Sequence, residues 1–196
     1  AHICLYLGLN KSSEALNLPK YNLWYYKHDG IDSIFEEATL ENAPENFAYI
    51  SFPSAKDPNW ETKNPGTATI QAISVGNMEW FDRYKDSKWM KRGDEYLQIK
   101  KNFEKEMLKV LYRFFPQIEG TVVASEVSTP LSTENFTNYK SGEIYGLAHT
   151  PERFTLPFLR PKTKIKGLFL AGQDITLVGV AGAMLSGLLC ATAILK

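Results

Sequence analysis

The sequence has few residues that could build a nucleophilic, thiol-based or metal-bound catalytic centre. It contains two cysteines, Cys4 and Cys190, near opposite ends of the chain, and three histidines without the spacing of metal ligands. Two cysteines so placed in apolar surroundings do not indicate a disulfide framework or a zinc cluster, and we expect no metal site. The serine hydrolase elbow, the Walker loop, the C-x-x-C pair and the H-E-x-x-H motif are also missing. Nucleophilic, phosphoryl-transfer and zinc mechanisms therefore have no residues to support them.

The chain also lacks an excess of charge of either sign. Lysine plus arginine and aspartate plus glutamate both number 22. This balance gives no basis for binding nucleic acid or an anionic membrane surface. With 44% hydrophobic and 22% charged residues, the composition is typical of a globular domain. No secretory leader is visible, and we expect a cytoplasmic protein, with peripheral membrane contact left open.

The most informative segment is the C-terminal one. Four apolar residues, 168–171, lie between Gly167 and Gly172 and predict a short buried strand. A run of small residues from Gly179 predicts the start of a helix. A helix start presents unpaired N–H groups and a partial positive charge, and glycine leaves room for a ligand. This junction is suited to an anionic or electron-rich cofactor, although close packing explains the same residues equally well.

The same segment has a second alternative interpretation as a membrane span. Residues 177–195 carry no charge and approach the ~20 residues that cross a bilayer. Glycines directly after the predicted strand, and the absence of tryptophan and tyrosine at both ends, favour a buried helix instead.

The remainder of the chain predicts an α+β fold, in which an antiparallel sheet with one wetter face is covered by helices. The predicted strands are residues 3–9, 23–27, 47–52, 67–75 and 121–127. Helices are predicted at 31–39 and 78–90, and a long one is expected from an Asp94 cap to Pro116 because its apolar residues recur every three or four positions. Residues 53–66 predict an irregular loop with a type II turn at Pro65-Gly66. Residues 132–142 predict a polar connector, and 151–166 predict mostly loop.

The C-terminal motif also carries a family resemblance. It resembles the flavin-binding signature of FAD-dependent phytoene desaturase-like oxidoreductases, of the amine oxidase superfamily, in the branch of retinol saturases and carotenoid isomerases. The residues that carry the resemblance are 168–174, 179–183 and 186–187, with upstream matches at 52–58, 129–132, 142–147 and 159–161. Members of this family open with a G-x-G-x-x-G fingerprint, which this chain lacks. The resemblance therefore implies the C-terminal part of a longer flavoprotein, with a substrate-binding domain over 1–147 and a piece of the FAD-binding domain, its last strand and helix, over 148–196.

The resemblance implies FAD as the cofactor of the parent protein. The helix beginning near Gly179 would direct its N–H groups at the isoalloxazine, where negative charge grows on reduction. Gln173 or Asp174 would bind the ribityl chain, although Asp174 is equally well explained as a turn residue. The candidate cofactor residues are Gly172, Gln173, Asp174, Gly179, Val180, Ala181 and Gly182. Since the pyrophosphate contacts would lie on the absent N-terminal half, we expect this chain alone to retain little or no FAD.

The resemblance further implies an apolar polyene substrate, a carotenoid or retinoid, whose C=C bonds are desaturated, saturated or isomerised. Trp24, Tyr25 and Tyr26 are candidate lining residues, although aromatic strand residues are more often core. Tyr145 and His149 are candidate proton donors, but a serine, a water molecule or no acid at all would serve as well. Two other classes remain open, a non-catalytic lipid-binding module that uses the aromatic sheet, and a membrane-anchored protein.

Overall fold

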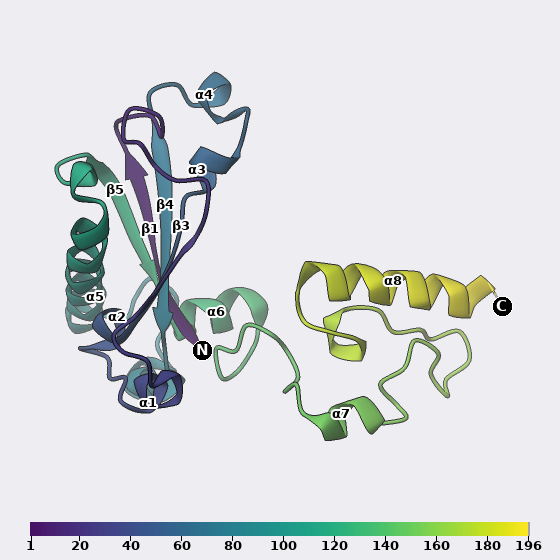
Figure 1. Cartoon of the computed structure of the whole chain (residues 1–196). Coiled ribbons are helices and arrows are strands. Elements are labelled where there is room, and N and C mark those ends of the chain that lie inside the picture. The colour runs from purple at the N-terminus through teal and green to yellow at the C-terminus, as the bar shows by residue number, and fades with distance from the viewer. Residues whose placement is uncertain (196) are drawn as a thin grey trace. The chain divides into compact units, whose positions relative to one another are not determined.

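The structure, a computed structural model, describes residues 1–195 and divides into two compact units. These units are Ala1–Glu143 and Ile144–Lys196 (Figure 1). The boundary lies between Glu143 and Ile144, four residues before the boundary expected from the family resemblance.

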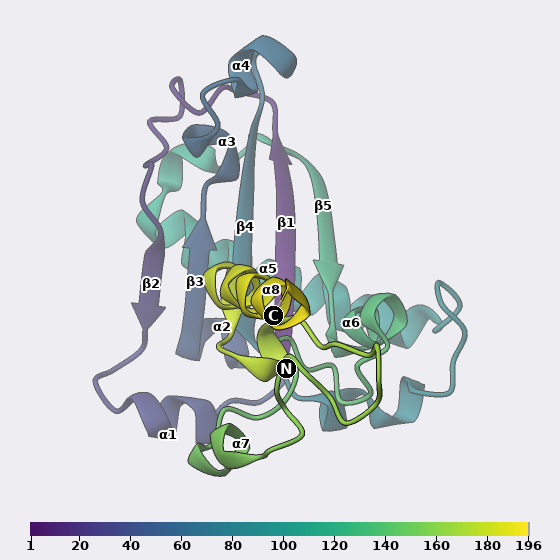
Figure 2. The same cartoon turned by 90° about the vertical axis from the view of Figure 1, so that its right-hand side faces the viewer.

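The first unit is built on a five-stranded antiparallel sheet. Its strands are β1 (His2–Leu9), β2 (Leu23–Tyr26), β3 (Phe47–Ser51), β4 (Ala68–Val75) and β5 (Val122–Ser128). Their order across the sheet is β2-β3-β4-β1-β5 (Figure 2). All five predicted strands and the antiparallel α+β architecture of this unit are confirmed.

One face of this sheet is covered by the long helix α5 (Asp94–Phe114), which Figure 1 shows running along it. Residues alternate along β4 between buried and partly exposed, because successive side chains point to opposite faces. The buried side packs with the apolar stripe of α5 to form the core, which includes Leu5, Ile70, Phe103, Met107 and Leu111. The predicted capping role of Asp94 is wrong, because Gly93 with φ 84° occupies the cap position and Asp94 is already helical.

Short helices occupy the segments that connect the strands. They are α1 (Ile31–Glu36), α2 (Ala43–Asn46), α3 (Pro53–Lys56), α4 (Trp60–Lys63), α6 (Pro130–Thr137) and the 3-10 helices η1 (Met78–Tyr84) and η2 (Pro116–Ile118). The predicted loop at 53–66 therefore contains two single-turn helices. The predicted type II turn is confirmed, since Gly66 has φ 68° and the Thr67 N–H donates to Asn64 O at 3.3 Å.

The connector predicted at 132–142 is largely a helix, α6. Thr129 and Ser132 form a capping box, in which each side chain bonds the backbone of the other residue. Pro130 occupies the first turn, where its missing N–H costs nothing. These local bonds outweigh the polar composition that had indicated a loop.

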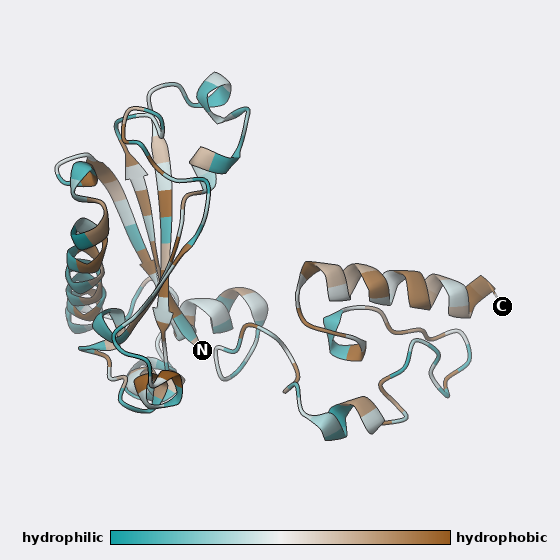
Figure 3. Ribbon diagram, viewed as in Figure 1, coloured by the Kyte–Doolittle hydropathy of each residue, from teal (hydrophilic) through white to brown (hydrophobic). Residues whose placement is uncertain are grey.

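The second unit contains α7 (Pro151–Thr155), the 3-10 turn η3 (Gln173–Ile175) and α8 (Gly179–Leu195). The predicted helix start at Gly179 is confirmed, and α8 is hydrophobic along much of its length (Figure 3). The predicted strand at 168–171 is wrong, because Phe169 makes only an isolated bridge to Lys162. An apolar run becomes a strand only beside another strand, and within residues 144–195 none adjoins it. Among residues 1–195, no helix has both the length and the apolarity needed to cross a membrane.

Candidate functional site

The first candidate site is the face of the sheet that points away from α5, which we call the open face. Residues paired across antiparallel strands project to the same side. The register therefore places Trp24, Tyr49, Ile73 and Cys4 in one row across β2, β3, β4 and β1. By the same alternation, the open face includes Cys4, Tyr6, Trp24, Tyr26, Phe47, Tyr49, Ser51, Gln71, Ile73 and Val75, with His2, Gly8 and Thr69 on the same side and Ala124, Glu126 and Ser128 continuing it on β5.

Aromatic rings dominate the open face near β2 and β3. Trp24 packs edge-on against Tyr49 with ring centroids 4.6 Å apart. Phe47 contacts three further rings, those of Trp24, Tyr26 and Phe35, at centroid distances of 6.1, 5.3 and 5.6 Å. Trp24 nevertheless remains 57% exposed, a high value for a tryptophan that packs against two other aromatic rings.

The three aromatic residues singled out on β2 lie on opposite sides of the sheet. Trp24 and Tyr26 are on the open face. Tyr25 packs against Phe114 of α5 at 5.5 Å, and its hydroxyl accepts a hydrogen bond from Arg113 at 3.2 Å. Tyr25 is therefore a packing residue of the covered face, whereas Trp24 and Tyr26 remain placed to meet a ligand.

A polar row lies beside the aromatic rings on the open face. Ser51, Gln71 and Tyr6 are register neighbours across β3, β4 and β1. Tyr6 is 44% exposed. Partial burial raises the pKa of its hydroxyl, and the adjacent Cys4 thiol raises this pKa further. Gln71 Nε2 donates to Cys4 Sγ at 3.4 Å, and Lys56 Nζ donates to Ser51 Oγ at 3.0 Å. The open face thus has an aromatic half and a hydrogen-bonding half.

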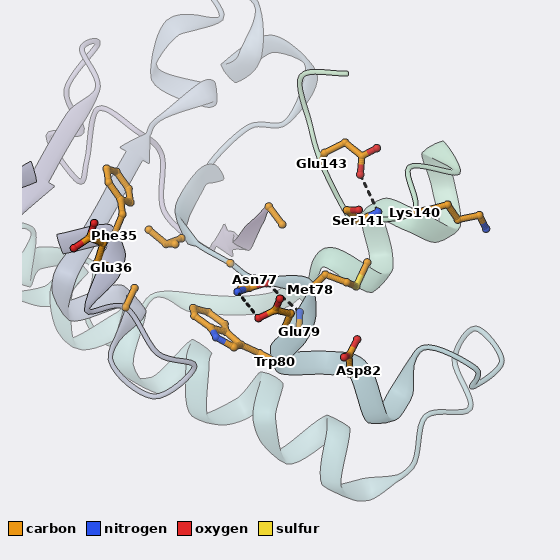
Figure 4. Close-up of a pocket in the computed structure, with 14 residues that line it drawn as sticks. Phe35, Glu36, Asn77, Met78, Glu79, Trp80, Asp82, Lys140, Ser141 and Glu143 are labelled. Atoms are coloured by element: carbon orange, nitrogen blue, oxygen red, sulfur yellow. Dashed lines mark hydrogen bonds between the residues drawn. The ribbon is translucent and has the colours of Figure 1, made fainter. Parts of the chain in front are cut away.

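A cavity of about 610 Å³ lies beyond the end of β4 and begins at Val75, a residue of the open face. Figure 4 shows Phe35 of α1 and Met78 and Trp80 of η1 among its walls. Its carboxylates are those of Glu36, Glu79, Asp82 and Glu143. The volume is in the range of small-molecule sites. The sequence did not indicate this cavity, because its walls come from four segments brought together only by folding, namely Ala1 and residues 35–38, 75–82 and 140–143.

The second candidate site is the turn that leads into α8. Gly172 and Gly179 have φ values of 122° and 91°, which favour glycine, and a Cβ added at either position would have no atom within 4 Å. Gly182 differs, because a Cβ there would lie 1.9 Å from the carbonyl oxygen of Leu177. The two interpretations of these glycines, room for a ligand and close packing, therefore apply to different residues. Gly182 serves close packing, and Gly179 leaves open space.

The first turn of α8 also has exposed side chains. Val180 is 80% exposed, and Ala181 is exposed beside it. A ligand could therefore approach the N-terminus of α8 on the side of Gly179, Val180 and Ala181.

The two polar residues of the turn make hydrogen bonds within their own unit. Gln173 Oε1 accepts the N–H of Gly179 at 3.3 Å, so it caps α8. Asp174 Oδ1 accepts the N–H of Leu147 at 3.0 Å and lies against Gly146. Asp174 therefore has the turn role that the sequence indicated as an alternative. Its second carboxylate oxygen, Oδ2, is the atom that a ligand could use.

Arg153 is the residue that organises this turn, and no sequence pattern had pointed to it. Its guanidinium donates to the carbonyl oxygens of Leu147 at 3.0 Å, Gln173 at 2.9 Å and Thr176 at 2.9 Å. Arg153 is only 5% exposed. A planar guanidinium has several donors at fixed angles and can bond separate carbonyls at once. Arg153 therefore holds the segments before and after η3 together.

The two candidate proton donors are both in the second unit. Tyr145 is 56% exposed. Both ring nitrogens of His149 lie 3.0 Å from Nη1 of Arg153. A neutral imidazole that accepts a hydrogen bond from Arg153 at one ring nitrogen keeps its proton on the other. His149 is also exposed, so the structure leaves both residues as candidates.

Comparison with known proteins links the chain to one group of enzymes, although it matches no family model. It is 32% identical over 202 residues to an all-trans-retinol 13,14-reductase from Danio rerio, covering 99% of this chain and 33% of the relative. The human protein of that name is 33% identical over 98% of this chain and 33% of its own length. The chain is part of a retinol saturase-like protein. This result confirms the resemblance inferred from the C-terminal motif.

The retinol saturase-like chain spans about a third of the length of the curated relatives it matches. A further relative from Danio rerio is named an inactive all-trans-retinol 13,14-reductase and is 30% identical over 97% of this chain. Similarity at this level therefore does not separate active from inactive members, and the residues of the site must be considered individually.

Proposed function

We propose that the protein containing this chain is an oxidoreductase that reduces a C=C bond of a retinoid, and that the open face is one wall of its substrate site. The names of the relatives support the reaction and the substrate class. The single observation that supports this position of the substrate site is the exposed Trp24 and its aromatic neighbours, on a sheet whose other face forms the core. Contiguous exposed apolar side chains with a polar rim are typical of ligand-binding surfaces.

The chemistry of the open face fits a retinoid. Trp24, Tyr26 and Tyr49 offer ring faces and edges to a flat conjugated chain. The row of Ser51, Gln71 and Tyr6 offers hydrogen bonds to a polar end group. The cavity beyond Val75 gives space for part of the ligand to extend past the sheet. Under this proposal Trp24 and Tyr26 bind substrate, as the resemblance implied.

We further propose that FAD is the cofactor, and that it binds at the start of α8. The residues there fit such a group, because Gly172 and Gly179 leave room where a side chain would intrude, and Val180 and Ala181 are exposed beside them. The first-turn N–H groups and the helix dipole would stabilise negative charge on a bound ring. Asp174 would offer its free carboxylate oxygen to a ribityl hydroxyl, while Gln173 and Gly182 would act by shaping the turn. When bound, reduced FAD supplies the hydride equivalent for the C=C bond.

The second unit would then be the C-terminal piece of the FAD-binding domain. Much of the apolar surface of α8 is exposed, including Val180, Met184 and Leu188. An apolar surface of this extent is normally covered, and the relatives are about three times as long as this chain. We propose that the remainder of the protein covers α8, and that the chain alone therefore retains little or no FAD.

A direct test uses the full-length protein that contains this chain. The purified protein, supplied with a reductant, is incubated with all-trans-retinol, and a product with one double bond fewer is sought by absorbance and mass. The variant Trp24→Ala is expected to raise KM severalfold, because Trp24 offers apolar contact to the whole ligand. Trp89→Ala is the matched control, since Trp89 packs on Phe136 of α6 outside the open face. If Trp24→Ala and Trp89→Ala have equal KM and kcat values, the open face is not part of the substrate site.

A second candidate function is retinoid binding without reduction. The relative named as inactive supports this second function, because its sequence identity to this chain is close to that of the relatives named as reductases. This function predicts saturable quenching of tryptophan fluorescence by retinol, sensitive to Trp24→Ala, with no reduced product and no flavin absorbance in the full-length protein.

A further inference from the structure

We infer that Tyr6 and Gln71 bind the hydroxyl end of the retinoid and so fix its direction on the open face. This inference rests on the proposed function, because it takes the open face as the substrate wall. It adds which end of the ligand lies where, and which residues discriminate for the alcohol.

The distribution of side chains on the open face gives the direction. Trp24 and Tyr49 are on β2 and β3, at one side of the sheet, where their packed rings, with 57% of Trp24 exposed, offer aromatic surface to an apolar ligand end. The strand β1 lies beyond β4 as seen from β2 (Figure 2). Tyr6 of β1 is paired with Gln71 of β4. A ligand with one apolar end and one hydroxyl end is therefore matched best with its hydrocarbon ring at Trp24 and its hydroxyl at Tyr6 and Gln71.

The separation of the two ends also suits a retinoid. From β2 to β1 there are three strand spacings, which amount to ~14 Å across the sheet. Tyr6 is also two residues further along β1 than Cys4, which is in the row of Trp24. This diagonal is comparable with an extended retinoid measured from its ring to its hydroxyl group.

The two polar side chains have the groups needed to recognise an alcohol. Tyr6 is 44% exposed, and its phenolic hydroxyl is a hydrogen-bond donor. Gln71 uses one N–H for Cys4 and retains its carbonyl oxygen as an acceptor for the alcohol proton. A ligand that lacks the hydroxyl would cover both groups without pairing them, and unpaired buried polar groups are the basis of strong discrimination.

This anchoring has a consequence for the choice of bond. In all-trans-retinol the 13,14 double bond is the one nearest to the carbon that carries the hydroxyl. A ligand held at the hydroxyl end keeps that bond at a constant position relative to Tyr6, while the more distant double bonds depend on the fit at Trp24. Tyr6 and Gln71 are thus specificity residues that decide which double bond is presented for reduction.

The test compares two substrates in the full-length protein, all-trans-retinol and its deoxy analogue with hydrogen in place of the hydroxyl. The wild-type protein should have a higher kcat/KM for retinol. Tyr6→Phe removes only the phenolic oxygen and is expected to reduce the ratio of the two kcat/KM values about three- to tenfold, as for the loss of one neutral hydrogen bond. Gln71→Leu should have an effect in the same direction. The matched control is Tyr112→Phe, which makes the same change on α5, on the opposite side of the sheet, and should leave the ratio unchanged.

The outcomes separate this inference from the function on which it rests. In one outcome, wild-type protein reduces retinol and Trp24→Ala lowers kcat/KM for both substrates alike, but Tyr6→Phe and Gln71→Leu leave the ratio of the two kcat/KM values unchanged. The inferred direction of the ligand is then wrong, and the open face remains the proposed substrate wall. If no variant of the open face alters either substrate, the proposed site fails as a whole. Reduction of double bonds further from the hydroxyl by Tyr6→Phe would support the role in bond selection. The isomeric products have equal masses and are distinguished by their absorbance spectra, because the remaining conjugated system differs in length.

Discussion

Replacing Arg153 should loosen the turn before α8 without unfolding the first unit. The guanidinium bonds three carbonyl oxygens, at Leu147, Gln173 and Thr176, while being almost fully buried. A hydrogen bond that involves a charged group contributes about 1.5–3 kcal/mol, and contributions within one cluster are not additive. Because the released carbonyls would regain water, we expect Arg153→Leu to lower the local opening free energy by about 2–4 kcal/mol. That loss corresponds to roughly 30- to 1,000-fold more frequent opening of the turn.

Amide hydrogen exchange of the full-length protein measures this opening directly. The peptides that cover 172–182 should exchange faster in Arg153→Leu, while those of the sheet in the first unit keep their protection. Arg153→Lys should recover little of the protection, because one ammonium cannot reach three carbonyls at the angles that the guanidinium fork supplies.

Arg160→Leu is the matched control for this experiment. Arg160 also bonds backbone carbonyls, those of Leu159 at 3.2 Å and Phe154 at 2.9 Å, but it is exposed. Its loss should leave the turn protected. Equal exchange at 172–182 in the Arg153 and Arg160 variants would refute the assignment of Arg153 as the residue that holds this turn.

Three further predictions concern α8 and the cofactor. Gly182→Ala should destabilise the second unit by several kcal/mol, about the cost of an overpacked core, because the new Cβ would meet the backbone of Leu177. At Gly187 a new Cβ would have open space, so Gly187→Ala should be neutral or stabilise α8 by about 0.5–1 kcal/mol. Thermal unfolding of the two variants measures the difference. Met184→Lys should improve the solubility of the 196-residue chain expressed alone and impair folding of the full-length protein, and a harmful effect in both would mean that α8 is already covered within this chain. The chain expressed alone should be colourless and the full-length protein yellow, and a flavin spectrum in the chain alone would contradict the proposed division of the FAD site.

The elements that the sequence predicted well are those with a strong period of their own. Alternation of apolar and polar side chains located β4, and the three-or-four spacing from Tyr96 to Phe114 located α5. The strand expected at 168–171 failed for the opposite reason, since its apolar run contains no information about a neighbouring strand. The helix α6 had a usable local signal in Thr129, Pro130 and Ser132, which the polar composition of the segment concealed.

The candidate sites were predictable only in part. Alternation separates Trp24 and Tyr26 from Tyr25, but only the packing of α5 shows which side is covered. Gly179 and Gly182 are alike in sequence, and their difference depends on where the carbonyl of Leu177 lies. Arg153 has no sequence signal, because its partners are backbone oxygens, which every residue has.

The bond of Asp174 to Leu147 has a consequence for the length of the chain between them. It fastens two points 27 residues apart, and Arg153 bonds the same two ends at Leu147 and Gln173, so the turn before α8 is held whatever path the chain takes in between. Lengthening a loop whose ends are already fastened costs only about 0.6 kcal/mol for each doubling. The exposed residues Lys164 to Lys166 are therefore a suitable place to insert a fluorescent tag or a protease site into the full-length protein while keeping the cofactor turn intact.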